Sequence, residues 1–239
     1  MIPIQWKQND KKTMHVNEAE NGVVYLTWPA IEKIEGIRHA FSTRIGGVSK
    51  EHLSSMNLSF SRGDDPANVR ENYRRFCEAA GFEVENIVTS DQAHTTKVRY
   101  VTKADCGSGV TRDRDFHDID GMITDEPGVV LATFYADCVP LYFVDPVHRA
   151  IGLSHSGWRG QATLDAMHER FGTEAKDVIA AVGPSICQEC YEVSGDVIEE
   201  FRAAFPETLH EKLFCGKPDG KYQLNLWEAN HQILLAAGV

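Results

Sequence analysis

The sequence predicts an α+β fold in which a mixed β-sheet is flanked by helices within one domain of 239 residues. Apolar and β-branched runs broken by turn residues gather in the middle third, whereas two amphipathic helical segments close the chain. Strands mixed with segregated helices are typical of this class. A chain of this length buries a full core, so a second domain is not required.

The N-terminal third is expected to contain two strands and one helix. Asp65 is a good N-cap, Pro66 suits the first helical position, and Gly81 follows Ala80 as a helix stop. This pattern predicts a helix over residues 66–80. The strands are expected over residues 23–28 and 37–43.

The rest of the chain supplies most of the expected sheet. Strands are expected over residues 87–89, 98–101, 128–135, 140–144, 149–154 and 177–182. Helices are expected over 161–171, 196–205 and 226–237, the last with Asn225 and Glu228 spaced as a capping pair. The polar stretch 103–118 is expected to form an exposed loop.

Composition excludes several classes of protein. The formal net charge of −11 argues against a nucleic-acid partner, because phosphate binding needs clustered Lys and Arg. The N-terminus turns polar before a secretory apolar core could form, and no apolar run approaches the length of a bilayer span. We therefore expect a cytoplasmic protein without membrane contact, whose six cysteines are thiols or ligands rather than disulfides.

The most informative stretch contains Asp137 and Cys138, followed seventeen residues after the cysteine by His155. If the runs 128–135, 140–144 and 149–154 form a meander, the first and third strands point the same way. Cys138 and His155 then lie at the same edge of the sheet.

Cysteine and histidine are zinc ligands, but a catalytic zinc site usually has a third protein ligand and leaves one position open. His94 is the best candidate for that ligand, because it lies in a polar turn between two expected strands. His39 and His117 remain further candidates.

Two other interpretations use the same residues. Spacing alone favours a structural role, with Cys138 as a small buried side chain and His155 as a hydrogen-bonded turn residue. A metal-free interpretation makes Cys138 a thiolate nucleophile, His155 its base and Asp137 or another carboxylate the orienting group.

The strand that ends near His155 is followed by Gly157, Arg159 and Gly160 and then by an expected helix. Free backbone N–H groups, a helix N-terminus and a guanidinium together suit an anion, although a tight turn with a solvated arginine explains them equally well. Arg44 before two glycines has the same two interpretations.

Two other motifs are interpreted as structural. The acidic loop around Asp118 and Asp120 lacks the carboxylate register of a calcium-binding hand and is treated as a turn. Cys187 and Cys190 have no second cysteine pair at the spacing of a zinc knuckle.

Taken together, these segments resemble the YfiH-like family, also called the multicopper polyphenol oxidase or laccase-like family, which includes purine nucleoside phosphorylases. The resemblance extends over nearly the whole chain. It is carried by Phe41-Ser42-Thr43-Arg44, Gly46-Gly47-Val48-Ser49, Asn57-Leu58, Gly63-Asp64-Asp65, Val69-Arg70-Glu71-Asn72, Gln92-Ala93-His94, Asp120-Gly121-Met122-Ile123-Thr124, Ala136-Asp137-Cys138-Val139-Pro140, His155-Ser156-Gly157-Trp158-Arg159-Gly160, Gly183-Pro184-Ser185-Ile186 and Cys190-Tyr191-Glu192-Val193.

The resemblance implies that His94, Cys138 and His155 are the metal ligands, with zinc as the usual metal and copper possible. It implies a fold distantly similar to the catalytic domain of cytotoxic necrotising factor. Family members usually continue past the helix that ends near Gly238, so this chain is expected to lack a C-terminal segment.

The implied activities are phosphorolysis of adenosine, inosine and S-methyl-5'-thioadenosine, and deamination of adenosine. We expect Asp137 to shuttle a proton. The nucleoside and phosphate are expected to bind at Gln92, and at Arg44 and Arg159 with the N–H groups of Gly157 and Gly160. The alternatives are a copper-dependent polyphenol oxidase, a cysteine hydrolase acting on peptidoglycan precursors, and a non-catalytic binding protein.

Overall fold

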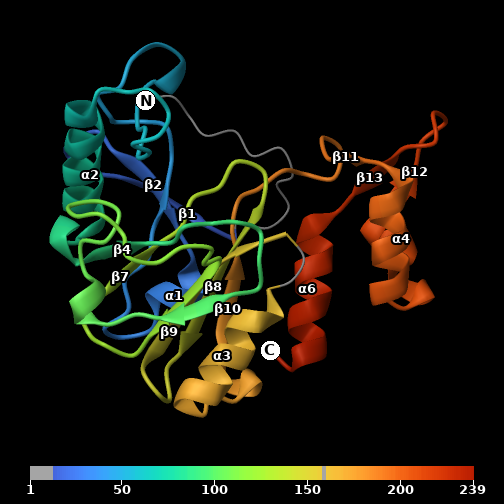
Figure 1. The fold of residues 1–239 in the computed structure, drawn as a ribbon. Coiled ribbons are helices and arrows are strands. Elements are labelled where there is room, and N and C mark those ends of the chain that lie inside the picture. The colour runs from blue at the N-terminus through green and yellow to red at the C-terminus, as the bar shows by residue number, and fades with distance from the viewer. Residues whose placement is uncertain (1–12, 158–159) are drawn as a thin grey trace. The chain divides into compact units, whose positions relative to one another are not determined.

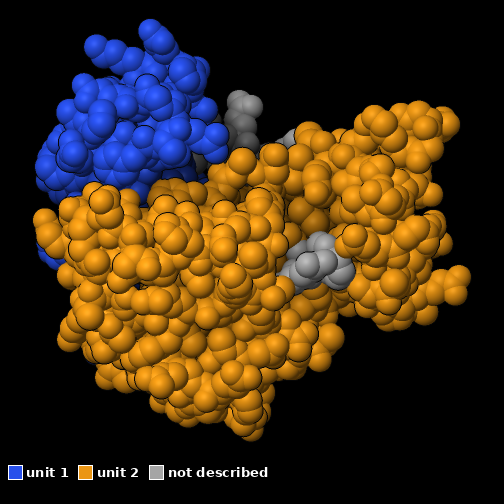
Figure 2. All heavy atoms as spheres, viewed as in Figure 1, with its two compact units in different colours: residues 1–84 blue, residues 85–239 orange. Residues whose placement is uncertain are grey.

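The computed structural model describes residues 13–157 and 160–239, which divide into two compact units with a boundary after Val84 (Figure 2). Each unit has its own sheet structure. That the whole chain acts as one domain stays a prediction. Within the described residues, no helix is both long and apolar enough to cross a bilayer.

The first unit contains a three-stranded antiparallel sheet and one long helix. Its elements are β1 (His15–Glu18), β2 (Val24–Thr27), α1 (Pro29–Glu32), β3 (Phe41–Ser42), a 3-10 turn (Glu51–Leu53) and α2 (Pro66–Ala80). The bounds of α2 are those predicted. The Asp65 side chain accepts the N–H of Ala67, and Gly81 ends the helix with a φ of 74°.

The strand predicted over 37–43 is wrong in its first half, because only Phe41 and Ser42 pair with β2. Just beyond β2, the backbone N–H of Trp28 donates to the Nε2 atom of His39 at 2.7 Å. A side chain therefore takes the place that a backbone carbonyl would occupy in a longer ladder.

The second unit is built on a five-stranded sheet with the order β10-β8-β9-β6-β5. Strands β5 and β6 are parallel and the other neighbours are antiparallel, which confirms the predicted mixed sheet. A smaller sheet has the order β11-β13-β12, and β4 pairs with β7. The strands are β4 (Ile87–Thr89), β5 (Val98–Tyr100), β6 (Gly121–Thr124), β7 (Val130–Ala132), β8 (Val139–Asp145), β9 (Ala150–Ser156), β10 (Ile179–Val182), β11 (Glu192–Val193), β12 (Phe214–Gly216) and β13 (Tyr222–Leu224).

The predicted meander is wrong in its first strand. The run 128–135 shortens to β7, which leaves the main sheet and pairs in parallel with β4. Its expected place beside β8 is taken by β10, and the other neighbour of β9 is β6, which the sequence analysis did not predict as a strand. The β8–β9 hairpin is as expected, and it alone brings the start of β8 to the end of β9.

Helices α3 and α6 lie against the main sheet (Figure 1). The helices of this unit are α3 (Gln161–Phe171), α4 (Gly195–Ala204), α5 (His210–Leu213) and α6 (Leu226–Ala237). The bounds of α3 and α6 match the prediction, and Asn225 caps α6 by accepting the N–H of Glu228 at 3.1 Å. Neighbouring residues of β6 enter different cores, because Ile123 packs in the cluster shared with α3 and α6, whereas Met122 packs with Val88 and Val101.

A carboxylate in the first unit ties the loop before α2 together. Asp64 accepts hydrogen bonds from the side chains of Ser49 at 2.6 Å and of Asn57 and Asn68 at 3.0 Å, and from the N–H of Asp65. These bonds, led by that of Ser49, lower the pKa of Asp64 to about 2.

A depressed folded-state pKa adds stability that is present above the unfolded pKa of about 3.9 and is lost as the pH falls through the folded value. We therefore expect Asp64→Asn to lower the free energy of unfolding at pH 7, with a gap to wild type that narrows below about pH 4. Urea denaturation across this range checks the gap, and NMR titration checks the pKa. A folded Asp64 that titrates near 4 would contradict the prediction.

Candidate metal centre

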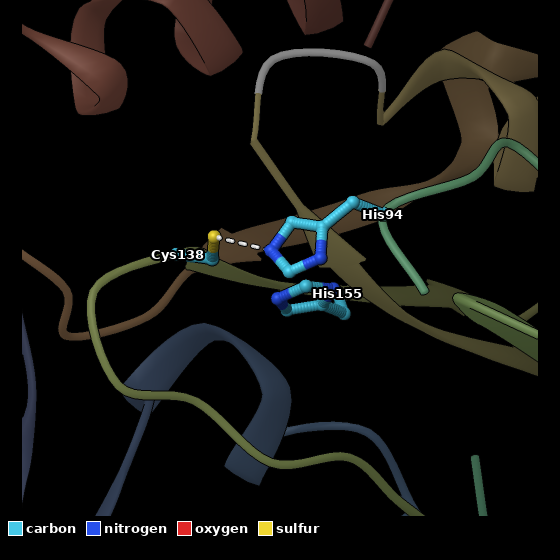
Figure 3. Close-up of side chains that lie close together, drawn as sticks. All are labelled: His94, Cys138 and His155. Carbon is cyan, nitrogen blue, oxygen red and sulfur yellow. Dashed lines mark hydrogen bonds between the residues drawn. The ribbon is translucent and has the colours of Figure 1, made fainter. Parts of the chain in front are cut away.

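The three predicted ligands converge. One ligand atom from each of His94, Cys138 and His155 lies within 4.8 Å of the other two, which is close enough for all three to hold one metal ion. The Sγ atom of Cys138 is 3.6 Å from Nε2 of His94, and the two imidazole rings lie 4.7 Å apart at 80°. Figure 3 shows the three side chains gathered around a common point.

Each ligand comes from a different element of the second unit. Cys138 directly precedes β8, and His155 lies near the end of β9 opposite Pro140. His94 lies in the loop that connects β4 to β5. The predicted common edge for Cys138 and His155 is therefore present, although β8 and β9 create it without the strand that the meander required.

Burial changes steadily across the three ligands. His155 is only 8% exposed, Cys138 is half-buried and His94 is exposed. A cation held by these groups would be supported by protein on the side of His155 and would face solvent on the side of His94. A structural zinc site usually closes all four positions, so this gradient favours a catalytic arrangement.

Asp120 connects two of the three ligands. Its Oδ1 atom is 2.8 Å from Nδ1 of His155, and its backbone carbonyl accepts the N–H of the same histidine at 2.7 Å. The carboxylate also accepts the backbone N–H groups of Ala93, His94 and Thr95 at 2.7–3.1 Å. With Nδ1 occupied by the carboxylate, Nε2 of His155 carries the lone pair that a metal needs.

The surroundings of two ligands, His155 and Cys138, favour their uncharged forms. Burial lowers the pKa of His155, and the bond to Asp120 only partly offsets this. Burial also raises the pKa of the Cys138 thiol, as do the nearby carboxylates of Asp137 and Asp120. A bound cation would stabilise the thiolate of Cys138, and the thiol proton would be released to solvent.

The metal-free nucleophile hypothesis fits this geometry less well. Cys138 makes its hydrogen bond to His94 and not to His155, which was the expected base. The expected orienting group was Asp137 or another carboxylate, and the carboxylate that pairs with His155 is that of Asp120. A raised thiol pKa also disfavours a thiolate at neutral pH.

Gln92, predicted to bind substrate, fastens the loop of His94 to the chain before Cys138. Its Nε2 donates to the carbonyl of Phe134 at 2.5 Å, and its Oε1 accepts the N–H of the same residue at 2.7 Å. Ser90 donates to the same Oε1 atom at 3.0 Å. These contacts give Gln92 a positioning role, and its substrate-binding role stays a prediction.

Asn230, which is fully buried on α6, holds the end of β9. Its side-chain carbonyl accepts the hydroxyl of Ser156 at 2.9 Å, and its amide donates to the carbonyl of Gly157 at 2.8 Å. The start of the predicted anion loop is therefore attached to the core of the second unit.

The glycines of this loop have different roles. A Cβ atom at Gly160 would approach Leu141 Cδ1 to 2.1 Å, so the glycine permits close packing at the start of α3. A Cβ atom at Gly157 would meet nothing within 4 Å, so that position is open. Arg159 lies outside the described residues, and its phosphate-binding role stays a prediction.

Arg44 lies in the first unit, where its guanidinium organises a turn. Nη2 donates to the carbonyls of His52 and Ser54 at 2.7 Å, and Nε donates to the carbonyl of Ser54 at 3.0 Å. Its role toward phosphate stays a prediction.

The other candidate histidines have partners of their own. His39 accepts from the backbone of Trp28, and His117 pairs with Asp91 at 2.9 Å. Among the described residues, the only group of three or more His, Cys, Asp or Glu side chains placed to hold a metal is that of His94, Cys138 and His155.

Sequence reasoning missed two residues beside this site. Asp120 was interpreted as part of a turn, although an Asp-Gly pair before the apolar run 122–124 was a signal for a residue at a strand end. Tyr191 is half-buried, and burial raises the pKa of its hydroxyl, as do the charges of Cys138 and Asp137. No spacing could have placed Tyr191 near Cys138, because their proximity arises from tertiary packing.

Comparison with known proteins shows the family to which the chain belongs. The model of the family described as multi-copper polyphenol oxidoreductase laccase matches residues 38–239, and the chain belongs to this family. It is 39% identical over 208 residues to a protein named purine nucleoside phosphorylase YlmD from Geobacillus stearothermophilus, covering 83% of this chain and 74% of the relative.

Two further comparisons concern a relative with a different name and a solved structure. Over 216 residues the chain is 31% identical to a protein named adenosine deaminase RL5 from an unknown prokaryotic organism, covering 87% of this chain and 81% of the relative. The crystal structure of the hypothetical protein YfiH from Bacillus licheniformis superposes with a TM-score of 0.81 at 32% identity, over 93% of this chain and 84% of that one. The relatives' names support an enzyme, and the superposition confirms the fold.

The bonds of Gln92 yield a stability prediction. Gln92→Ala leaves the N–H and carbonyl of Phe134 without their partner, so we expect the free energy of unfolding to fall by about 1–2 kcal/mol. Gln232→Ala, which removes a side-chain pair with Glu228 on α6, should change it by less than about 0.5 kcal/mol. Urea denaturation measures both. Unchanged stability with a raised KM would instead indicate the predicted substrate contact.

Proposed function

We propose that this protein is a metal-dependent purine nucleoside enzyme, which catalyses phosphorolysis of adenosine, inosine and S-methyl-5'-thioadenosine and deamination of adenosine. Its partners are then a nucleoside and phosphate. The convergence of His94, Cys138 and His155 carries the proposal, because it gives a three-ligand site with an exposed side. The names of the relatives, phosphorylase and deaminase, support the choice of substrate.

The donor set fits zinc. Two imidazoles and one thiolate are ligands that Zn²⁺ prefers, and three protein ligands leave a position for water or substrate. The hydrogen bond from His155 Nδ1 to a carboxylate is the outer-shell contact usual for a metal-binding histidine. Cu²⁺ also binds imidazole, so copper is the second candidate metal.

For deamination, a zinc ion bound to these three residues would supply Lewis acidity that makes water nucleophilic near neutral pH. We assign proton transfer to Asp137, which is exposed and precedes Cys138 in the chain: its carboxylate would take up the proton that the nucleophilic water loses and give it to the leaving amino group.

For phosphorolysis, phosphate must be aligned against the ribose C1′ while its charge is neutralised. Gly157 supports this role, because its position is open and its carbonyl is fixed by Asn230. We assign the remaining phosphate contacts to the N–H of Gly160 and to the guanidinium group of Arg159.

The description of the family favours one second candidate, copper-dependent oxidation of phenols. The same three side chains would hold the copper. Activity toward a phenol that requires copper, without release of a free base from inosine, would identify this function instead.

Metal removal tests the proposal directly. We expect chelation to abolish inosine phosphorolysis and adenosine deamination, and added Zn²⁺ to restore both. Base release and ammonia release are measured on the same samples, alongside metal content. Full turnover in demonstrably metal-free protein would refute the proposal.

A ligand variant adds a second test. Cys138→Ala should lose stoichiometric zinc and reduce turnover by at least about 100-fold, because it removes a ligand rather than an outer-shell contact. Cys215→Ala is the matched control, since this exposed cysteine lies on β12 and belongs to no ligand group. Equal loss in both variants would point to a general effect of cysteine removal.

A further inference from the structure

Asp120 is only 2% exposed, and its carboxylate accepts hydrogen bonds from five donors. Three are the consecutive backbone N–H groups of residues 93–95, the fourth is the Thr95 hydroxyl at 2.9 Å, and the fifth is His155 Nδ1. A carboxylate with this many partners has little freedom to rotate. Its position fixes that of the groups around it.

Those donors belong to two ligand-bearing segments that are distant in the sequence. The His94 backbone has a φ of 58°, a left-handed conformation that is unfavourable for a residue with a side chain. Three N–H groups that point at one carboxylate hold the loop in this conformation. Through its other contact, Asp120 fixes the tautomer and the ring orientation of His155.

We infer that Asp120 is a positioning residue of the metal centre, which sets the geometry of both histidine ligands together with the contacts of Gln92 and the β8–β9 pairing. The inference rests on the proposed metal-dependent function and deepens it. It predicts that the site is largely formed before metal binds, because the contacts that orient both histidines are within the protein.

A buried carboxylate can also stabilise a loop without positioning a metal ligand. The chain contains such a carboxylate, Asp145, for comparison. Asp145, fully buried at the opposite end of the β8–β9 hairpin, accepts the N–H groups of Val147 and His148 and pairs with His148 Nδ1 at 2.7 Å. It has the same Asp-His chemistry, but His148 belongs to no ligand group among the described residues. Asp145→Asn is therefore a matched control for Asp120→Asn.

The experiment compares the 239-residue wild-type chain with the two variants after metal removal. Zinc affinity is measured by competition with a chromophoric chelator at one pH. Absorption of the Co²⁺ form reports the ligand geometry, and urea denaturation of the metal-free proteins reports stability. We expect Asp120→Asn to weaken zinc binding by about 10–100-fold and to change the cobalt spectrum. Asp145→Asn should lose stability but keep zinc affinity within about twofold.

The outcomes separate the hypotheses. Wild-type zinc affinity and an unchanged cobalt spectrum in Asp120→Asn would overturn the inference and leave the proposed function intact. Equal loss of affinity in both variants would also overturn it. A wild-type chain that binds neither zinc nor cobalt would remove the metal centre itself, and the inference with it.

A milder variant covers the case in which Asp120→Asn does not fold. Thr95→Val removes one hydroxyl donor to the carboxylate and keeps every backbone donor. We expect about a threefold loss of zinc affinity, by analogy with other outer-shell changes, together with a shifted cobalt spectrum. Wild-type values for both quantities would contradict the inference.

Discussion

Antiparallel pairing of β8 with β9 determines where the chemistry of this protein can occur. The register puts Pro140 opposite His155, so the residue two positions before Pro140, which is Cys138, emerges beside the histidine. Both strands are buried over most of their length. Core packing therefore fixes their register, because a shift of one residue would turn every side chain to the opposite face of the sheet. Two of the three ligands are therefore fixed by the same interactions that fold the sheet.

The third ligand depends on polar contacts instead of core packing. His94 is exposed and lies on a loop, so no apolar side chain of its own holds it in place. Two sets of hydrogen bonds hold it instead. The side chain of Gln92 is bonded to the backbone of Phe134, and the backbone N–H groups of residues 93–95 are bonded to the carboxylate of Asp120. The first set joins the loop to the segment that precedes Cys138, and the second joins it to Asp120, which is bonded to His155. The site is thus a network in which moving one ligand disturbs the others.

Helix ends could be predicted from the sequence, because capping residues and glycines next to them determine where a helix begins and ends. The cap at Asp65 and the glycine at 81 gave the bounds of α2. The edge shared by Cys138 and His155 was predicted from a three-stranded meander, of which the β8–β9 hairpin is present and is sufficient to create that edge. Strand partners were predicted poorly, because β6 and β7 are short and their pairing is decided by packing on both faces of the sheet. The role of Asp120 was hidden for the same reason, since its five donors come from segments that meet only in the folded chain. Resemblance to a family, and not spacing, singled out His94.

The electrostatic state of the ligands bears on which chemistry the fold favours. Burial keeps His155 neutral and the Cys138 thiol protonated, while the carboxylates of Asp120 and Asp137 lie close to that thiol. Such surroundings oppose a free thiolate, because they would place a third negative charge beside two others. They favour a divalent cation, which neutralises the thiolate as it forms and is attracted by the same carboxylates. The groups that make Cys138 a poor nucleophile by itself therefore make it a good metal ligand. The same arrangement of residues thus disfavours a metal-free cysteine hydrolase and favours a metal-dependent enzyme.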